Sequence, residues 1–292
     1  MKKLRQIVEA AFVIGGYRAL GLLPMRVASD LGGAVARFVG PKLRVSARAR
    51  ANLRRFLPEL GEAGIERTVR EMWDNLGRTA AEYPHLTRMT VFEPGADIDV
   101  AGVEHVDAAK RAGKPIIFFA AHLANWELAG LAAARHGTPV HLVYREANNR
   151  HVETLFREGR GAFAAGLIPK GASGARLAMQ ALKAGKHLGM LLDQKMNDGI
   201  AVPFFGVEAM TAPALAILAQ RFDCAVLPVR VERVTDGPRF RVTVEAPLPV
   251  PRGGDKAADA RALMAAVNAR MEEWIRARPG QWLWLHRRWP NP

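Results

Sequence analysis

The spacing of hydrophobic and polar positions changes near residue 97. Before this point apolar residues recur at intervals of three and four, which is typical of helices packed through one face. This pattern predicts a helix in the amino-terminal segment and further helices over 25–39, 46–56 and 65–82. After residue 97, short runs rich in β-branched and aromatic residues are typical of strands. They predict strands at 98–100, 115–121, 139–144, 187–192, 224–231 and 240–245.

Helical stretches alternate with these strands along most of the second part of the chain. Helical spacing is found at 103–111, 125–136, 148–165, 173–184 and 212–222, and a longer helix closes the chain at 255–278. Such alternation predicts an α/β fold in which a helical N-terminal region is followed by a mostly parallel sheet flanked by helices.

Two strands of this predicted sheet, 116–121 and 188–192, are almost wholly apolar. Strands buried on both faces have this character, so we expect both at the centre of the sheet. Ligands of open α/β sheets bind at the carboxyl ends of the strands. The residues that follow the two strands, His122 and Asp193, are therefore the first candidates for a functional site.

The composition indicates a folded chain without disulfides. Hydrophobic residues make up 49% and charged residues 24% of the 292 positions, which excludes disorder over most of the chain. The single cysteine, Cys224, excludes an intrachain disulfide, and its apolar surroundings favour a core residue over a nucleophile. No spacing of His, Cys or Glu resembles a metal-ligand set, so the sequence predicts no metal and no bound cofactor.

The formal net charge of +14 favours acidic partners. Nucleic acid, an anionic membrane surface and an acidic protein or phosphorylated substrate all fit this charge. The arginines are dispersed along the chain, and zinc-finger spacing, RNP-like aromatic motifs and basic-region heptads are missing from the sequence. We therefore expect no nucleic acid among the partners.

The first 24 residues have a basic start and an apolar body that charged residues interrupt. This body is too short and too interrupted for a transmembrane helix, and no signal-peptide cleavage site follows it. At helical spacing Leu4, Ile7 and Val8 share one side, as in a helix lying in a membrane interface, although a helix packed on the core has the same pattern. We expect residues 1–24 to form a membrane-interface helix and residues 25–292 to form a single α/β domain.

His122 and Glu127 form the pair of residues most suggestive of catalysis. On one regular helix they would diverge by roughly 140°, given about 3.6 residues per turn. We expect His122 in the turn after its strand and Glu127 in the first turn of a helix capped by Asn125, so that the carboxylate reaches the imidazole. A carboxylate so placed orients a general-base histidine. By itself the pair also fits a strand-end histidine and a helix-dipole glutamate.

Further motifs accompany the stretch His122-Leu-Ala-Asn-Trp-Glu127. They are Val143-Tyr144-Arg145, Leu192-Asp193-Gln194, Val202-Pro203-Phe204-Phe205-Gly206, Ala209-Met210-Thr211 and the block from Pro279 to Trp289. Together these motifs, over residues 115–289, resemble the lipid A biosynthesis lauroyl/myristoyl acyltransferase family, whose signature is a His-x4-Asp/Glu box. Lys195 and the short amino-terminal region depart from the family pattern.

This resemblance implies a glycerolipid-acyltransferase-like fold and a lipid A late acyltransferase. A fatty acyl chain would pass from acyl carrier protein to the hydroxyl of a hydroxyacyl chain on a lipid A precursor. The enzyme would lie at the cytoplasmic face of the cell inner membrane, held there as a peripheral or monotopic protein. Acyl carrier protein and lipid A precursors are both anionic, which agrees with the charge of +14.

The resemblance also assigns roles to individual residues. His122 would be the general base and Glu127 would orient it. Arg145 would bind the oxyanion or a substrate phosphate, although a surface salt bridge fits it equally well. Asp193 would position a substrate group or hold Arg145, although a residue that only caps its loop fits the sequence too. Asn125 would bind substrate or fix the His122 loop.

The carboxy-terminal Trp and Arg residues also allow two interpretations. Arg287 and Arg288 alternate with Trp284 and Trp289, which suits a belt at the level of lipid headgroups. Tryptophans in the core with solvated arginines fit the same sequence.

Two other functions compete with this interpretation. An acyl-CoA-dependent glycerolipid or glycolipid acyltransferase would use the same His122 and Glu127. A basic membrane-binding or nucleic-acid-binding module without activity is a second alternative. A serine hydrolase is disfavoured because the segment around Ser173 lacks the last glycine of a Gly-x-Ser-x-Gly elbow.

Overall fold

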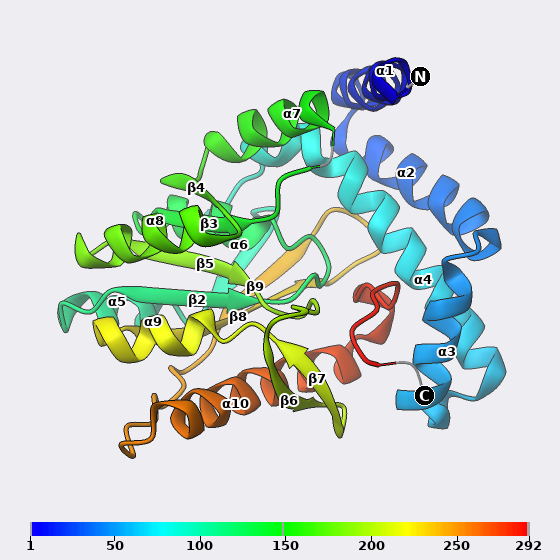
Figure 1. The fold of residues 1–292 in the computed structure, drawn as a ribbon. Helices are drawn as coiled ribbons and strands as arrows, with labels where there is room; N and C mark the ends of the chain where they lie inside the picture. Colours follow the sequence, from blue (N-terminus) through cyan, green and yellow to red (C-terminus); the bar gives the residue numbers. More distant parts are fainter. Residues whose placement is uncertain (1, 148, 291–292) are drawn as a thin grey trace.

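A computed structural model describes residues 2–147 and 149–290, and Figure 1 shows its ribbon. The helices of this part of the chain are α1 (Lys2–Leu22), α2 (Met25–Val39), α3 (Ser46–Phe56), α4 (Gly61–Glu82), α5 (Val103–Arg111), α6 (Leu128–Arg135), α7 (Arg150–Gly161), α8 (Ala172–Lys183), α9 (Ala214–Phe222) and α10 (Lys256–Ala277). Its strands are β1 (Ile98–Ala101), β2 (Ile116–Ala120), β3 (Val140–Tyr144), β4 (Gly166–Pro169), β5 (His187–Leu191), β6 (Ile200–Phe204), β7 (Val207–Thr211), β8 (Ala225–Arg233) and β9 (Phe240–Val244).

Seven of the strands form one sheet in the order β1-β9-β8-β2-β5-β3-β4. Neighbouring strands are parallel except β8 and β9, which pair antiparallel. The prediction of a helical N-terminal region followed by a mostly parallel, helix-flanked sheet is confirmed.

The apolar strands β2 and β5 lie side by side in the middle of this sheet, as their composition predicts. Every residue of β2 is buried. One face of the sheet packs with α5 and α6, and the other packs with α8, α9 and α10, so each face has its own hydrophobic core. This burial on both faces explains why β2 tolerates no polar residue.

Some elements differ from the sequence-based expectation. The short edge strand β4 and the hairpin of β6 and β7 were not predicted. Pro169 ends β4, and Pro203 interrupts the apolar run of β6, so neither segment has the composition of a central strand. The helix expected from residue 125 begins only at Leu128, because the chain turns through Ala124 in a left-handed conformation (φ 48°).

The helical amino-terminal region is built on α4, against which α2 packs closely. The backbones meet at Gly32 and Gly77, where a Cβ atom on Gly32 would lie 2.5 Å from the carbonyl oxygen of Gly77. A larger side chain at either position would push the helices apart. Figure 1 shows α4 lying between α2 and the sheet.

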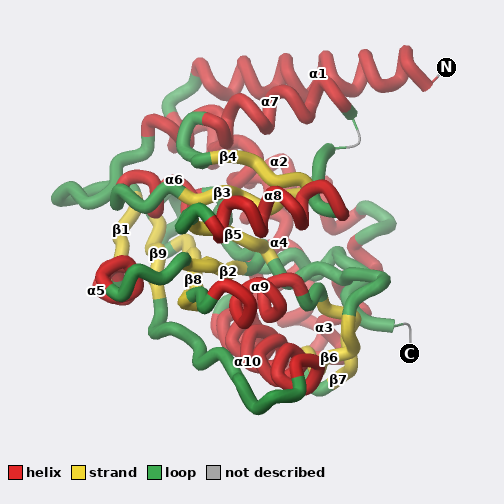
Figure 2. Tube along the Cα trace, turned by 60° about the vertical axis from the view of Figure 1, so that its left-hand side comes forward, coloured by secondary structure: helices red, strands yellow, loops and turns green. Residues whose placement is uncertain are grey.

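The predicted amino-terminal helix is present as α1, which runs alongside α7 (Figure 2). The side-chain amide of Asn149, at the start of α7, donates to the backbone carbonyl of Gln6 (2.8 Å). The side chains of Leu4, Ile7 and Val8, on which the membrane-interface prediction depends, lie outside the described residues. Within the described residues, no helix combines the length and the hydrophobicity that crossing a bilayer requires.

Candidate active site

His122 lies just beyond the carboxyl end of β2, and its imidazole is hydrogen-bonded to Asp193, which follows β5. Nδ1 of His122 is 2.8 Å from Oδ1 of Asp193, and the backbone N–H of His122 donates to Oδ2 (3.2 Å). The indole N–H of Trp282 donates to the same Oδ2 (2.8 Å). The carboxylate is thus held by three donors, and its hydrogen bond to Nδ1 leaves Nε2 of His122 as the lone-pair nitrogen.

Asp193 is fully buried. Burial raises the pKa of Asp193, but the charge of His122 and the hydrogen bonds from His122 and Trp282 outweigh burial and hold this pKa well below its usual range. A buried carboxylate next to an imidazole stabilises the imidazolium that forms when the ring takes a proton. The expectation that Asp193 holds Arg145 is corrected: among the described residues its carboxylate pairs with His122 and Trp282 and not with Arg145. That Asp193 positions a substrate group stays a prediction.

Glu127 does not reach the imidazole of His122 in this structure. Its carboxylate accepts three hydrogen bonds from Arg160 on α7, one from Nη2 (2.5 Å) and two from Nε (3.0 and 3.2 Å). Burial lowers the pKa of Arg160, but the bonds to Glu127 outweigh burial and raise it above its usual range. The prediction that Glu127 orients His122 directly is therefore wrong, because the turn at Ala124 directs the two side chains to different partners.

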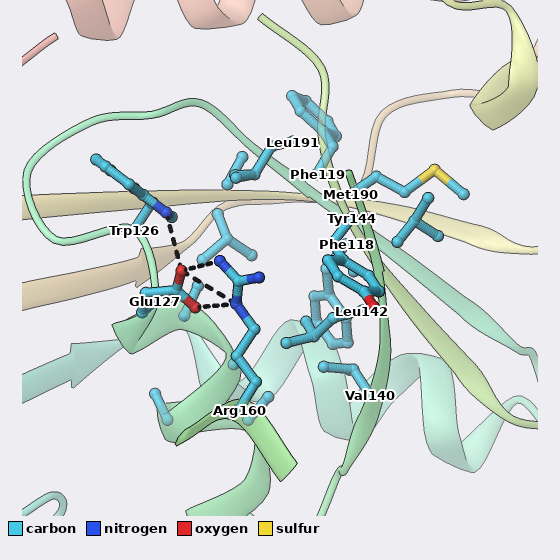
Figure 3. A pocket seen from close by; sticks show the side chains of 18 of the residues that line it. Phe118, Phe119, Trp126, Glu127, Val140, Leu142, Tyr144, Arg160, Met190 and Leu191 are labelled. Carbon is cyan, nitrogen blue, oxygen red and sulfur yellow. Dashed lines mark hydrogen bonds and ion pairs between the residues drawn. The ribbon is translucent and has the colours of Figure 1, made fainter. Parts of the chain in front are cut away.

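Trp126 connects Glu127 to the imidazole. The indole N–H of Trp126 donates to Glu127 (3.2 Å), and its ring meets the imidazole of His122 edge-on with centroids 5.0 Å apart. Figure 3 shows Glu127 held between Arg160 and Trp126. Trp126 thus lies between Glu127 and His122, and among the described residues no hydrogen bond joins Glu127 to the imidazole.

Two polar residues at the imidazole were missed by sequence reasoning. The side-chain amide nitrogen of Gln194 lies 3.3 Å from Nε2 of His122 and 3.3 Å from Nε2 of His286, and it can donate one hydrogen to each. Burial lowers the pKa of His286, His122 adds to this effect and Asp193 opposes it. Gln194 and His286 both belong to motifs of the family resemblance, and this was the one signal that could have identified them.

An apolar cavity of about 500 Å³ opens beside His122. Its wall crosses one face of the sheet from β3 to β1 and is closed by α6, whose small residues Gly130 and Ala133 leave room. Six strands of the sheet line the cavity, and neighbouring strands lie about 4.8 Å apart. The part of the sheet that lines the cavity is therefore roughly 24 Å wide. Figure 3 shows Phe118, Leu142 and Met190 along this wall. A long apolar chain fits such a space.

Two cations line the cavity near its polar end. Arg145 follows β3 and Lys170 follows β4, so the parallel strands place both at the same edge as His122. Burial lowers the pKa of Lys170, with Asp193 opposing and Arg145 adding to the shift. Among the described residues, neither cation has a carboxylate within 4.0 Å.

Asn125 is fully buried and does not line the cavity. Its amide donates to Glu82 (3.0 Å), and Glu82 forms a bidentate ion pair with Arg233 of β8 (2.6 and 3.0 Å). Asn125 therefore fixes the His122 loop, one of the two roles expected for it, and it does not cap α6, which has no side-chain cap. Direct substrate binding by Asn125 does not fit this geometry.

The carboxy-terminal segment folds into the core and brings His286 to the site. Trp284, Arg288 and Trp289 are buried. The guanidinium of Arg288 donates to the backbone carbonyl of Met210 (2.7 Å) and to the hydroxyl of Thr211 (2.8 Å). Of the two interpretations, the headgroup belt is wrong and the tryptophan core is confirmed, although only Arg287 of the two arginines is solvated.

Comparison with known proteins assigns this chain to a family. The family model described as bacterial lipid A biosynthesis acyltransferase matches residues 1–291. The chain is 27% identical to a lipid A biosynthesis palmitoleoyltransferase of Escherichia coli over 91% of this chain and 86% of that protein. It is 24% identical to a phosphatidylinositol mannoside acyltransferase of Mycolicibacterium smegmatis over 97% of this chain and 92% of that protein.

Among solved structures, the chain is similar to the 1-acyl-sn-glycerophosphate acyltransferase PlsC of Thermotoga maritima. The sequence identity is 15%, the TM-score is 0.39, and the match covers 95% of this chain and all of the other. The family match extends over nearly the whole chain and includes the His122 box and the carboxy-terminal block. The chain is therefore an O-acyltransferase that belongs to the bacterial lipid A biosynthesis acyltransferase family.

Proposed function

We propose that this enzyme transfers a fatty acyl chain from acyl carrier protein to the hydroxyl of a hydroxyacyl chain on a lipid A precursor, with His122 as general base. The observation that carries this proposal is the bond between His122 and the buried Asp193 at the mouth of a long apolar cavity. Membership of the family supports acyl transfer as the reaction. The geometry of the site supports His122 as the base and the cavity beside it as the space for the acyl chain.

The first step of this reaction is removal of a proton from the acceptor hydroxyl. Nε2 of His122 accepts the proton while the hydroxyl oxygen attacks the thioester carbonyl carbon. The ionised Asp193 stabilises the resulting imidazolium through Nδ1. No enzyme nucleophile is required, because the acceptor oxygen forms the new ester bond itself.

The attack produces an oxyanion that needs hydrogen-bond donors. In the free enzyme Gln194 donates to Nε2 of His122, so the incoming hydroxyl must displace this bond. The freed amide N–H then lies next to the reacting carbon and donates to the oxyanion, while His286 holds the other hydrogen. Arg145 is a second donor at the same edge of the sheet. Collapse of the intermediate breaks the carbon–sulfur bond, and the imidazolium returns its proton to the departing thiolate.

Substrate charges complement this arrangement. Acyl carrier proteins are acidic and lipid A precursors carry phosphates, which suits a chain of net charge +14 with Arg145 and Lys170 at the cavity. The enzyme would act on the cytoplasmic face of the inner membrane, where such a lipid is accessible. Acyl-CoA as donor and a glycolipid as acceptor form the second candidate, which the likeness to a phosphatidylinositol mannoside acyltransferase favours.

A mass-spectrometric assay tests the proposal. Purified enzyme is incubated with lauroyl-loaded acyl carrier protein and a lipid A precursor, and the acceptor is examined for a mass gain of one acyl chain. We expect the gain with the wild type and its loss in His122→Ala. The matched control is His105→Ala, a histidine outside the cavity, which should retain activity.

Two outcomes would redirect the proposal. Transfer from lauroyl-CoA to a glycolipid, without transfer from the carrier protein, would support the second candidate. Full activity in His122→Ala with either donor would remove His122 from the mechanism.

A further inference from the structure

The outer side of α2 carries a continuous apolar surface. Its members are all exposed, and together we name them the α2 apolar face: Val27, Leu31, Ala34, Val35, Phe38 and Val39. At 100° per residue, five of the six (all but Val39) cover a continuous arc of about 100° that holds no polar residue, and Val39 lies beyond the buried Ala28 at its edge. Phe38 is 70% exposed.

The opposite side of α2 is already occupied. Ser29 and Gly33 are buried, and Gly32 meets the backbone of α4. The hydroxyl of Ser29 donates to the buried Glu82 (2.7 Å). Because α2 is fixed to the core by this side, its apolar face is held outward and needs no rearrangement to meet a partner.

Cations follow the α2 apolar face at its carboxyl end. Lys42 and Arg44 come directly after α2, and neither has a carboxylate within 4.0 Å among the described residues. Nζ of Lys42 lies 3.5 Å from the centre of the Phe38 ring, so charge and apolar surface adjoin. An exposed apolar strip with cations at its borders is the pattern of a helix that lies in an anionic membrane interface.

We propose that the α2 apolar face docks on a bilayer that contains anionic phospholipid, with Phe38 and Leu31 entering the acyl region. A second copy of the chain fits this surface less well. In a two-fold pair of antiparallel α2 helices, Arg26 at the start of α2 in one copy would approach Lys42 and Arg44 of the other, and like charges would meet. An anionic lipid surface neutralises the same cations.

This docking would set the active site beside the lipid. The amino-terminal helix α1, joined to α2, contacts α7 through Asn149, and α7 carries Arg160 into the cavity wall. In Figure 1 strands β2 and β5 point toward the side of the molecule where α4 and α2 lie. The inference rests on the proposed function only for the statement that the acceptor is a lipid.

Vesicle binding tests the inference without using activity. Wild-type enzyme is sedimented with vesicles of phosphatidylglycerol and phosphatidylcholine in equal parts. We expect the double variant Leu31→Glu/Phe38→Glu to bind at least tenfold more weakly. The matched control is Leu177→Glu/Ile217→Glu, which adds the same charge at comparably exposed apolar positions (44% and 52%) on α8 and α9, far from α2 in Figure 1. This control should bind within about twofold of wild type, so equal loss in both variants overturns the inference.

A fluorescent variant covers the case in which the double variant does not fold. Phe38→Trp should give a blue-shifted emission on addition of the same vesicles and should be quenched by brominated lipid, whereas Ile217→Trp should give neither effect. Absence of both effects at residue 38 contradicts membrane docking. A concentration-dependent dimer that Leu31→Glu dissolves would assign the surface to a second copy instead.

Activity separates this inference from the proposed function. With the acceptor dispersed in detergent micelles, Leu31→Glu should keep the wild-type kcat because α2 does not contact the cavity. Loss of vesicle binding with retained micellar activity supports both proposals. An enzyme that binds vesicles through α2 but acylates no lipid would contradict the proposed function alone.

Discussion

The imidazole of His122 is hydrogen-bonded to the carboxylate of Asp193, which lies 71 positions later in the chain. The register of the sheet explains this contact. In the parallel pair of β2 and β5, Ala120 lies opposite Leu191, and His122 and Asp193 each follow two residues later. The acid that serves the histidine is therefore supplied by the neighbouring strand and not by the His-x4-Glu box.

Replacing Asp193 by Asn should lower kcat at least a hundredfold with little change in KM. The amide keeps the size of the side chain but removes the charge that stabilises the imidazolium. Steady-state kinetics would measure the effect, and circular dichroism would confirm the fold. Glu127→Gln is the comparison, because it weakens the bond to Arg160 without touching His122. A larger kcat loss in Glu127→Gln than in Asp193→Asn would contradict the assigned pairing.

Replacing Gln194 by Met should lower kcat by about tenfold to a hundredfold and leave KM nearly unchanged. Methionine has similar length but no donor, so the oxyanion loses a hydrogen bond made only in the transition state. The same kinetic assay separates kcat from KM. A raised KM with unchanged kcat would instead assign Gln194 to ground-state binding.

Replacing Ala133 by Leu should shorten the acyl chain that the enzyme accepts. Ala133 lines the cavity from α6, and the added methyl groups would occupy space beneath the sheet. We expect kcat/KM for long-chain donors to fall roughly tenfold while short-chain donors are used as before, since a few methylene groups carry about 1–3 kcal/mol of discrimination. Competition between donors of two lengths measures the ratio. Arg135→Leu, at an exposed position, should leave it unaltered.

Removal of Arg233 should destabilise the protein strongly. Arg233→Met would leave Glu82 buried without its cation, at a cost of about 3–5 kcal/mol of unfolding free energy. Urea unfolding measures this loss. The control is Arg241→Met, which breaks an exposed pair with Asp99 and should change stability by less than about 1 kcal/mol. Similar losses of unfolding free energy in the two variants would show that burial does not increase the contribution of the Glu82–Arg233 pair to stability.

Acidification should destabilise the protein through His187. The backbone N–H of Ile116 donates to Nδ1 of His187 (3.1 Å), and burial lowers the pKa of this ring, with Lys110 and Lys186 adding to the shift. Below the unfolded pKa of about 6.5 the unfolded chain binds a proton that the folded chain excludes, so the free energy of unfolding falls as the pH falls.

The variant His187→Asn isolates this effect. Its side-chain oxygen can accept the N–H of Ile116 but does not titrate. Urea midpoints at about pH 8 and pH 5.5 should differ less for the variant than for the wild type. Equal differences would place the acid sensitivity at other groups.

Much of the fold follows from local pattern. The alternation of apolar runs and helical spacing predicted the α/β class, and the uniform apolarity of β2 and β5 predicted their central position. Both features depend on neighbours in the chain, where periodicity is visible. Strand β4 was missed because it is short, lies at the edge of the sheet and ends in Pro169. The β6–β7 hairpin was missed because Pro203 interrupts β6 and the hairpin lies outside the seven-stranded sheet.

The candidate site likewise depends partly on local sequence and partly on tertiary structure. His122 and Asp193 could be selected from the sequence because each directly follows an apolar strand, and Glu127 could be selected by its spacing from His122. Which acid reaches the imidazole depends on the register between strands and on the left-handed turn at Ala124, and no local pattern encodes either.

The contributions of distant segments depended still more on tertiary structure. Gln194 and His286 meet where the carboxy-terminal segment folds back on the core, held by Arg288 at the β6–β7 hairpin and by Asn52 of α3. The exposure of the α2 apolar face follows from tertiary structure, because the other side of α2 packs on α4. Sequence by itself determined which residues have the chemistry for acyl transfer. Tertiary structure decided which of them meet, because those contacts join residues whose separation along the chain leaves no periodic trace.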